Sequence, residues 1–472
     1  MTTSRPTDAW AHLGLVEVGD RIRRRDLTSE QVTSEALSRV SRLDGHLNSF
    51  VVVLAEDAMQ QAQAADREIL SGVWRGPLHG VPVAVKDLLD IKGLPTGAGS
   101  LILRSTIAET DATVVRRLRS AGAVIIGKVH TTEAALLDYH PSLPQPRNPW
   151  SAEHWAGASS SGSGVATAAG LCYGAIGTDT GGSIRTPSAA NGITGLKPTW
   201  GRVSRYGLFP MADSLDHIGP MARSAQDVAA MLQAIAGADS QDPTALLAPR
   251  DDYLGKIAKP IDGVVIGIDD AFALDGLDAE IARPVRDFCE VMIDLGAQIK
   301  SVKVPWDDEI NDAGLAIMLA ELAHTHADLF SAHASQYGPK AAVTIEIGRN
   351  IEVGSYIAAT QRRAAFVGEM DRMFQDVDLL ITPGLGIPVP SLADLEALAS
   401  DVDAVRHTLY RFASPFNLSG LPTLSFPGGS DANRMPIGLQ LVGGRLTEAL
   451  LCRAGYAFQQ VTSHHVRRPE IA

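Results

Sequence analysis

The chain has 472 residues, of which 45% are hydrophobic and 20% charged, the balance of a folded globular protein. Its 54 acidic and 41 basic residues give a net charge of −13, spread along the chain, which argues against nucleic acid or an anionic membrane as a partner. No apolar run reaches the ~18 residues that span a bilayer. A polar start and three widely spaced cysteines predict a cytoplasmic protein without a secretory leader, a disulfide framework or a four-ligand zinc site.

The first 75 residues predict helices. Thr28 and Gln31 form a capping-box pattern, and the apolar residues behind them share one helical stripe: Val32, Ala36, Val40 and Leu43. Residues 54–71 are rich in Ala, Gln and Glu and predict a second helix by propensity. We therefore treat residues 1–75 as a helical N-terminal portion.

From residue 76 onward, strands alternate with helices. Residues 80–85 predict a short buried strand, residues 113–120 a helix and residues 123–127 the next buried strand. Continuous apolar strands of this kind are typical of a sheet that is covered on both faces. We predict an α/β fold with a mixed, mostly parallel central sheet and helices on both faces.

The alternation of strands and helices resumes after a polar, proline-containing stretch at residues 236–262, which is the best candidate for a boundary between two portions of the chain. Beyond it we predict strands at 263–268, 298–304, 378–382, 422–427 and 437–442, and helices at 278–295, 310–330, 355–375 and from 447. Because both halves share this pattern, we predict a single domain over residues 1–472, with a catalytic core at 76–235 and a substrate-side portion at 236–472.

Two glycine- and serine-rich segments, residues 157–164 and 177–185, flank an alanine-rich stretch at 165–174 that predicts a short buried helix. Gly181 and Gly182 allow a sharp turn that aims several backbone N–H groups at one point, as an oxyanion hole requires. A serine that directly follows such a turn is well placed to act as a nucleophile. The sequence therefore makes Ser183 a candidate nucleophile.

Serine at its ordinary pKa is a weak nucleophile and needs a base. The thirteen histidines show no recognisable triad spacing, although triads are set in space rather than in sequence. Lys86 directly follows the predicted strand at 80–85, and sites in open α/β sheets gather at the carboxyl ends of strands. Burial without a close carboxylate would lower its pKa and make it a base. Asp87 and Asp90 would prevent this if they pointed inward.

Taken together, these segments resemble the amidase signature family, and the matching motifs follow in the family's order along nearly the whole chain. The motifs lie at residues 80–87, 157–163, 177–185, 195–199, 214–216, 219–221, 417–422 and 436–440. The resemblance implies hydrolysis of an amide C–N bond through an acyl-enzyme, with no cofactor and no metal.

The resemblance also implies roles for individual residues. Ser183 would be the nucleophile, Lys86 the general base, and Ser159 the bridge between them, preceded in the family by a cis peptide bond. The oxyanion would be held by backbone N–H groups, and the loop would be oriented by Asp179 with Arg185. The implied oxyanion donors are Thr180, Gly181, Gly182 and Ser183. Ala158 and Ser161 stand where the family often has glycine, which leaves the chemistry intact.

Two other functions compete with a stand-alone amidohydrolase. One is the glutaminase-type component of a tRNA-dependent amidotransferase, a branch in which the resemblance implies an acidic residue before the 417–422 motif and an arginine pair near Arg349. Residues 409–416 contain no acid and Arg349 stands alone, which favours the hydrolase. The other is a phosphate- or nucleotide-binding module, but the loop lacks the lysine of a P-loop.

The expected substrate is a small amide, with ester or carbamate (urethane) as further possibilities because their carbonyls meet the same oxyanion hole. An apolar group, aryl included, is indicated by a set of large side chains near the two loops, although ordinary core packing explains them equally well. The candidate pocket residues are Leu136, Tyr139, Trp155, Phe209 and Met211.

Overall fold

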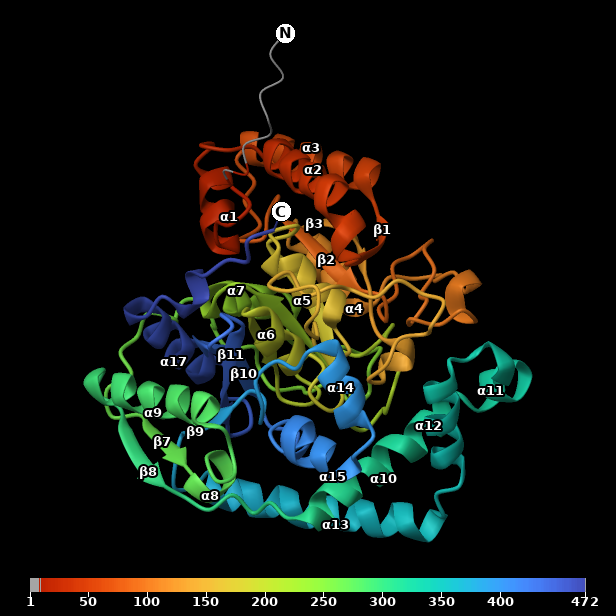
Figure 1. Ribbon diagram of the computed structural model, residues 1–472. Coiled ribbons are helices and arrows are strands. Elements are labelled where there is room, and N and C mark those ends of the chain that lie inside the picture. Colours follow the sequence, from red (N-terminus) through yellow and green to blue (C-terminus); the bar gives the residue numbers. More distant parts are fainter. Residues whose placement is uncertain (1–7, 9, 472) are drawn as a thin grey trace.

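The computed structural model describes residue 8 and residues 10–471, and a single mixed sheet of eleven strands forms its centre (Figure 1). The strands are β1 (Phe50–Val53), β2 (Pro82–Lys86), β3 (Val124–Val129), β4 (Gly174–Asp179), β5 (Thr194–Lys197), β6 (His217–Ala222), β7 (Val265–Ile268), β8 (Gln298–Ser301), β9 (Leu379–Pro383), β10 (Thr423–Ser430) and β11 (Pro436–Gly443). Their order across the sheet is β1-β3-β2-β4-β6-β5-β10-β11-β9-β7-β8. The predicted α/β class and single mixed sheet are confirmed.

Parallel pairing is confined to two parts of the sheet. The strands β3, β2 and β4 run parallel to one another, as do β9, β7 and β8. The six remaining neighbouring pairs among the described strands are antiparallel. The expectation that most strand pairs are parallel is therefore wrong. The antiparallel pairing of the central strands β5 and β6 and of the hairpin β10–β11 leaves no local signal in the sequence.

Helices cover both faces of the sheet. They are α1 (Leu15–Arg23), α2 (Ser29–Leu47), α3 (Ala55–Leu70), α4 (Thr113–Ser120), α5 (Ser161–Ala168), α6 (Arg185–Asn191), α7 (Ala225–Ile235), α8 (Asp270–Ala273), α9 (Ala279–Asp294), α10 (Asp308–Thr325), α11 (Ala327–His333), α12 (Pro339–Arg349), α13 (Val353–Met373), α14 (Leu392–Ala399), α15 (Val402–Val405), α16 (Ser414–Leu418) and α17 (Glu448–Val461). The α2 helix begins with the predicted capping box, in which the amide N–H of Gln31 donates to Thr28 Oγ1 over 3.1 Å.

Alternation along the strands divides the apolar core. In β2, Val83 and Val85 pack in one cluster with α1, α4, α7 and α17, whereas Ala84 packs in another with α2, α3 and α5. Successive side chains of a strand point to opposite faces, so a strand that is apolar at every position is buried on both. This confirms the two covered faces predicted from the continuous apolar run.

A third layer lies beside the sheet. In Figure 1 the helices α10, α12 and α13 lie at the opposite end of the molecule from α1, α2 and α3, and α10 packs on both α12 and α13.

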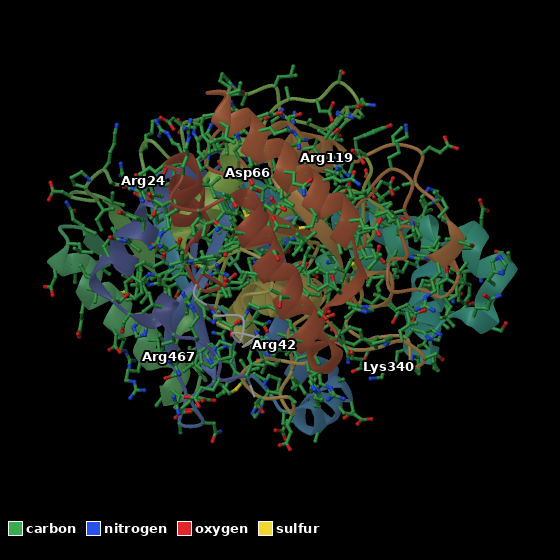
Figure 2. All side chains as sticks on the ribbon, turned by 90° about the horizontal axis from the view of Figure 1, so that it is seen from above. Arg24, Arg42, Asp66, Arg119, Lys340 and Arg467 are labelled. Atoms are coloured by element: carbon green, nitrogen blue, oxygen red, sulfur yellow. The ribbon has the colours of Figure 1, made fainter. Side chains whose placement is uncertain are left out.

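The labelled charges Arg24, Arg42 and Arg467 are spread over the surface in Figure 2 rather than gathered in one patch. Within residues 8 and 10–471, no helix is both long and apolar enough to cross a membrane.

One predicted helix ends early. The stretch at 165–174 predicts a short buried helix, but α5 spans residues 161–168, and Gly174 already begins β4. The five residues between them form a tight connection that returns the chain to the sheet. This early return places β4, and the loop at its carboxyl end, beside β2 and Lys86.

Candidate active site

Lys86 is the last residue of β2, with β3 on one side and β4 on the other, and its side chain is completely buried. Its amine donates to three hydroxyl oxygens, Ser159 Oγ at 2.7 Å, Ser160 Oγ at 2.9 Å and Thr178 Oγ1 at 2.8 Å. No ion pair involves Lys86 among the residues that the structure describes. The lysine therefore sits in a cage of neutral hydroxyls.

Burial is the largest influence on the pKa of Lys86 and lowers it to about 7, although the carboxylates of Asp179 and Asp216 act to raise it. Asp87 points away from Lys86, because its Oδ1 lies 2.7 Å from Lys128 Nζ. Asp90 likewise accepts a hydrogen bond from Thr96. Neither of the two aspartates that follow Lys86 neutralises it, so the condition for a basic lysine is met.

Ser159 lies in the loop that leads into α5. The Ala158–Ser159 peptide bond is cis, as the family resemblance implied, and the carbonyl of Ala158 accepts from Thr186 Oγ1 at 2.6 Å. The neighbouring Ser160 hydroxyl donates to the carbonyl of Thr178 and accepts from its N–H. These bonds attach the serine loop to the end of β4, next to Lys86.

Ser183 lies in the turn between β4 and α6 and keeps 9% of its surface exposed. Its carbonyl oxygen accepts from the N–H of Ser160 over 3.2 Å, so the two loops are joined next to the lysine. Among the described residues no hydrogen bond joins the hydroxyls of Ser159 and Ser183. The Ser183 side chain instead lines a small recess that opens toward a larger cavity.

The turn from Thr180 to Ser183 presents fewer free N–H groups than expected. The N–H of Gly182 donates to Asp179 Oδ1 at 2.8 Å, so this amide is already satisfied within the loop. The amides of Thr180, Gly181 and Ser183 have no protein acceptor among the described residues. Of the four N–H groups expected to hold the oxyanion, that of Gly182 is bonded within the loop and the other three are left without a protein acceptor.

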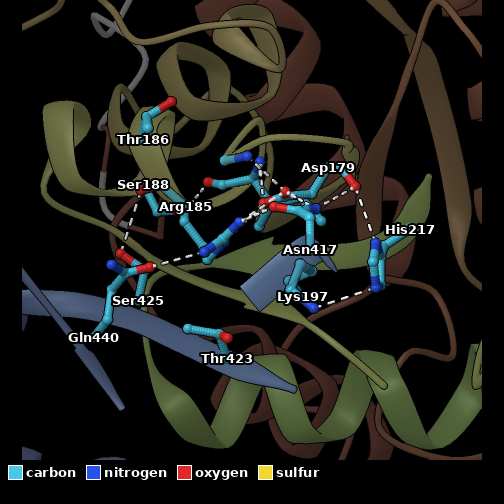
Figure 3. Close-up of polar contacts among 12 residues, drawn as sticks. Asp179, Arg185, Thr186, Ser188, Lys197, His217, Asn417, Thr423, Ser425 and Gln440 are labelled. Carbon is cyan, nitrogen blue, oxygen red and sulfur yellow. Dashed lines mark hydrogen bonds and ion pairs between the residues drawn. The ribbon is translucent and has the colours of Figure 1, made fainter. Parts of the chain in front are cut away.

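Asp179 and Arg185 hold this turn in place, as Figure 3 shows. The guanidinium of Arg185 contacts both carboxylate oxygens of Asp179 at 3.0 Å, and both residues are fully buried. Asn417 Nδ2 and the N–H of Ile184 also donate to the carboxylate. Burial opposes ionisation, but the Arg185 charge and these hydrogen bonds hold the pKa of Asp179 well below its usual range.

The recess at Ser183 adjoins a cavity of about 770 Å³. Both spaces share Leu136, Leu137, Gly181, Met318 and Tyr410, so they meet at the oxyanion turn. Half of the residues that line the cavity come from α10, α12 and the π-helical turn Arg406–Tyr410, and most of the lining surface is apolar. Five charged residues line it: Asp138 with Lys340 and Asp312 with Arg406 form partly exposed ion pairs, and Glu396 forms no ion pair with the described residues.

Three of the five expected pocket residues, Leu136, Trp155 and Met211, line the recess at Ser183. Tyr139 lines a neighbouring cavity instead, and its hydroxyl donates to Ser161 Oγ. Phe209 lines none of these spaces and packs edge-on against the ring of His326. The structure therefore brings three of the five expected residues to Ser183.

Several residues of the site escaped the sequence analysis. Ser160 and Thr178 complete the cage around Lys86; both lie within the two glycine- and serine-rich segments, but nothing in those segments marks them as contacts of the lysine. Met318 and Tyr410 lie far from these segments in sequence, and no local pattern marks them as cavity walls. Asn417 lies in a recognised motif, but its contact with Asp179 was not foreseen.

Comparison with known proteins gives the family. The family model described as Amidase matches residues 31–452, and a mycobacterial relative named "Putative amidase AmiD" (Mycobacterium tuberculosis) is 45% identical over 467 residues, 98% of this chain and 97% of that protein. The chain therefore belongs to the amidase signature family and is an amidase acting on C–N bonds.

Other relatives widen this picture. A glutamyl-tRNA(Gln) amidotransferase component of Chromohalobacter salexigens is 38% identical, with 96% of this chain and 98% of that protein covered. The crystal structure of native peptide amidase from Stenotrophomonas maltophilia matches with a TM-score of 0.83 at 31% identity, covering 98% of this chain and 99% of that one. The 6-aminohexanoate cyclic dimer hydrolase shares the fold at a TM-score of 0.88 and 24% identity, with 98% and 99% covered.

Proposed function

We propose that this amidase hydrolyses amides of apolar acids through an acyl-enzyme on Ser183. The observation that carries the proposal is the buried Lys86 amine, whose Nζ lies 2.7 Å from Ser159 Oγ, in a loop that is hydrogen-bonded to the carbonyl of Ser183. Lysine with a pKa near 7 accepts a proton efficiently at neutral pH. A base of this kind is what serine needs to attack a carbonyl.

The proposed proton path runs from Ser183 through Ser159 to Lys86. As Ser183 Oγ attacks the substrate carbonyl, its proton passes to Ser159 Oγ, and the Ser159 proton passes to Lys86 Nζ. The same path in reverse protonates the leaving amine when the C–N bond breaks, and water then repeats the cycle to release the acid. The hydroxyls of Ser159 and Ser183 are not hydrogen-bonded to each other in the described residues. This is compatible with the path, because catalytic hydrogen bonds often form only when substrate binds.

The developing negative charge on the substrate oxygen would be met by the amides of Thr180, Gly181 and Ser183. These three N–H groups lie next to one another in a turn that Asp179 and Arg185 hold rigid. Preorganised donors of this kind stabilise the transition state without reorganising during the reaction, and removing one commonly lowers the rate by about 10²–10³.

The substrate class follows from the cavity that adjoins Ser183. The surface that lines this cavity of about 770 Å³ is mostly apolar, which matches a small organic acyl or amine group. Esters and carbamates present the same carbonyl to the same donors, so we include aryl esters and urethanes as slower or alternative substrates.

The buried, unpaired state of the three cysteines agrees with a cytoplasmic location.

The second candidate is the glutaminase component of an amidotransferase, which the relatives at 34–38% identity favour. A glutamine head needs charged partners in the pocket. Arg349, the arginine expected to serve there, is exposed, bonds to Glu346 and does not line the cavity. The recess around Ser183 is lined by no charged side chain among the described residues. These features support the hydrolase.

The test is covalent labelling of the purified protein with an aryl fluorophosphonate, followed by mapping of the modified peptide by mass spectrometry. A single adduct on Ser183, absent from Ser183→Ala and Lys86→Met, is expected. Turnover is then measured on matched aryl amides, esters, carbamates and glutamine. An unlabelled protein would overturn the acyl-enzyme, and release of ammonia from glutamine in preference to the aryl amides would move the second candidate to the front.

A further inference from the structure

The peptide bond between Asp179 and Thr180 is held from behind by two side chains. Its carbonyl oxygen accepts from Asn417 Nδ2 at 3.1 Å and lies 3.1 Å from His217 Nδ1. Asn417 and His217 are both at least 98% buried and come from α16 and β6, which are distant in sequence. Figure 3 shows both side chains converging on Asp179.

Holding that oxygen determines the direction of the adjoining amide. A peptide unit is planar, and in its trans form the C=O and N–H bonds point to opposite sides. The N–H of Thr180 therefore points away from Asn417 and His217. Thr180 lines the cavity that adjoins Ser183, and its amide has no protein acceptor among the described residues.

The hydrogen bonds of His217 define which ring nitrogen carries the proton. Nδ1 faces two carbonyl oxygens, those of Leu215 at 2.6 Å and Asp179 at 3.1 Å, so it must be the donor. Nε2 then accepts from Lys197 Nζ at 3.2 Å, and the same amine donates to the carbonyl of Leu421. Burial and the neighbouring Lys197 lower the pKa of His217, which keeps the ring neutral in this tautomer.

We propose that His217 and Asn417 are positioning residues of the oxyanion hole, which aim the Thr180 N–H at the substrate oxygen by fixing the Asp179–Thr180 peptide. Lys197 supports them by holding the His217 ring in its donating orientation. This inference rests on the proposed acyl-enzyme mechanism. Neither side chain touches the reacting atoms, so their effect passes through a backbone group.

The inference predicts an effect on the transition state rather than on substrate binding. The negative charge on the substrate oxygen develops only as Ser183 attacks, so a poorly aimed Thr180 amide lowers kcat and leaves KM nearly unchanged. Complete loss of an oxyanion donor lowers the rate by about 10²–10³. A displaced donor should lower it by at least ~10-fold.

The matched pair His217→Asn and His217→Gln tests this. The amide nitrogen of Asn can occupy the place of Nδ1 and donate to Asp179, whereas that of Gln reaches only the place of Nε2. We expect kcat of His217→Asn within ~3-fold of wild type and kcat of His217→Gln at least ~10-fold lower, with KM changed less than ~2-fold in both. Equal kcat values for the two variants would overturn the proposal.

A second readout separates aiming from general loosening. A trifluoromethyl ketone forms a tetrahedral adduct that carries the oxyanion, whereas a benzamide-type competitor forms none. His217→Gln should weaken the ketone in proportion to kcat/KM and leave the competitor unaffected. Asn417 also lines the cavity, so Asn417→Ala should weaken the ketone clearly more than the competitor. If both inhibitors weaken alike, the residues are merely structural. Asn417→Ala removes the second side chain that donates to the Asp179 carbonyl. If His217→Gln does not fold, the Asn417→Ala variant still tests the proposal.

Failure of the mechanism and failure of this inference give different results. Wild-type protein that takes up no fluorophosphonate on Ser183 contradicts the proposed function before any variant is made. Wild-type protein that is labelled and active, together with a His217→Gln variant of unchanged kcat and unchanged ketone affinity, contradicts only the positioning role.

Discussion

Lys86 Nζ lies 2.7 Å from Ser159 Oγ, and the carboxylate next to Lys86 in sequence, Asp87, is turned to Lys128. The proposed base and the proposed bridge are therefore in direct contact. Two lysines on neighbouring strands divide the electrostatic work: Lys128 takes the adjacent negative charge, and Lys86 is left among hydroxyls.

Activity should depend on pH through Lys86. Its pKa is lowered to about 7 by burial, and the neutral amine is the form that accepts a proton, so kcat/KM should fall as pH decreases through about 7 and level off above about 8. Lys86→Met should lower kcat by at least ~10³, within the usual range for general base catalysis. The measurement is a pH–rate profile on a neutral aryl amide; a profile that rises toward low pH would exclude a lysine base.

Removal of Lys128 should destabilise the fold. Lys128→Met leaves the buried carboxylate of Asp87 without its partner, and breaking a buried ion pair commonly costs about 3–5 kcal/mol. Equilibrium urea unfolding measures the loss. The double variant Asp87→Asn with Lys128→Met is the control, and it should recover more than half of the stability because no unpaired charge remains. A single variant as stable as wild type would show that Asp87 is not charged in the fold.

The two adjacent glycines of the oxyanion turn should respond differently to alanine. Gly182 has a φ of +117°, and an added Cβ would lie 2.8 Å from Ala413 Cβ, so Gly182→Ala is both strained and obstructed. An added Cβ at Gly181 meets only ordinary contacts, 3.6 Å from Tyr410 Cε1.

We expect Gly182→Ala to lower both kcat, by at least ~10-fold, and the melting temperature, because that backbone region costs roughly 1–3 kcal/mol for a residue other than glycine. Gly181→Ala should melt within a few degrees of wild type, ~1 kcal/mol being worth about 2–4 °C in a large domain. Thermal melting and kcat of both variants decide the matter, and equal melting temperatures would contradict the steric argument.

The acyl cavity should be adjustable at Met318. This residue lines both the recess at Ser183 and the larger cavity, so Met318→Trp should lower kcat/KM for amides of bulky aryl acids by at least ~10-fold while sparing acetyl amides. Ile347→Trp places the same side chain on the exposed side of α12, outside the cavity lining, and serves as the control. A parallel loss on bulky and small amides would mean that Met318 is only a core residue.

Much of the fold could be predicted because its pattern is local. The helix at 113–120 and its neighbouring buried strand follow from periodicity, and the capping box at Thr28 from two side chains three residues apart. The strands β4 and β6 escaped prediction because they carry Gly, Pro, Thr and Asp within the stretch read as catalytic loops. Their extended form is imposed by pairing with each other rather than by propensity.

The candidate site divides in the same way. Lys86, Ser159 and Ser183 could be proposed from motifs, because the chemistry proposed for them restricts these residue types and their surroundings. The walls of the cavity could not, since Met318 and Tyr410 come from α10 and the turn before α16, which only tertiary packing brings to the same space. A wall residue needs only suitable size and apolarity, which many residues share, so nothing local distinguishes it.

The cavity draws its chemistry and its shape from different stretches of the chain. The lysine, both serines and the oxyanion turn lie between residues 86 and 183, whereas most of the cavity wall lies between residues 311 and 418. Substitutions in the second stretch can alter the accepted acid while the first stays unchanged. A library of variants confined to α10, α12 and the turn Arg406–Tyr410 should therefore change the substrate preference without altering the proposed catalytic residues. The same separation lets the substrate range evolve independently of the reaction.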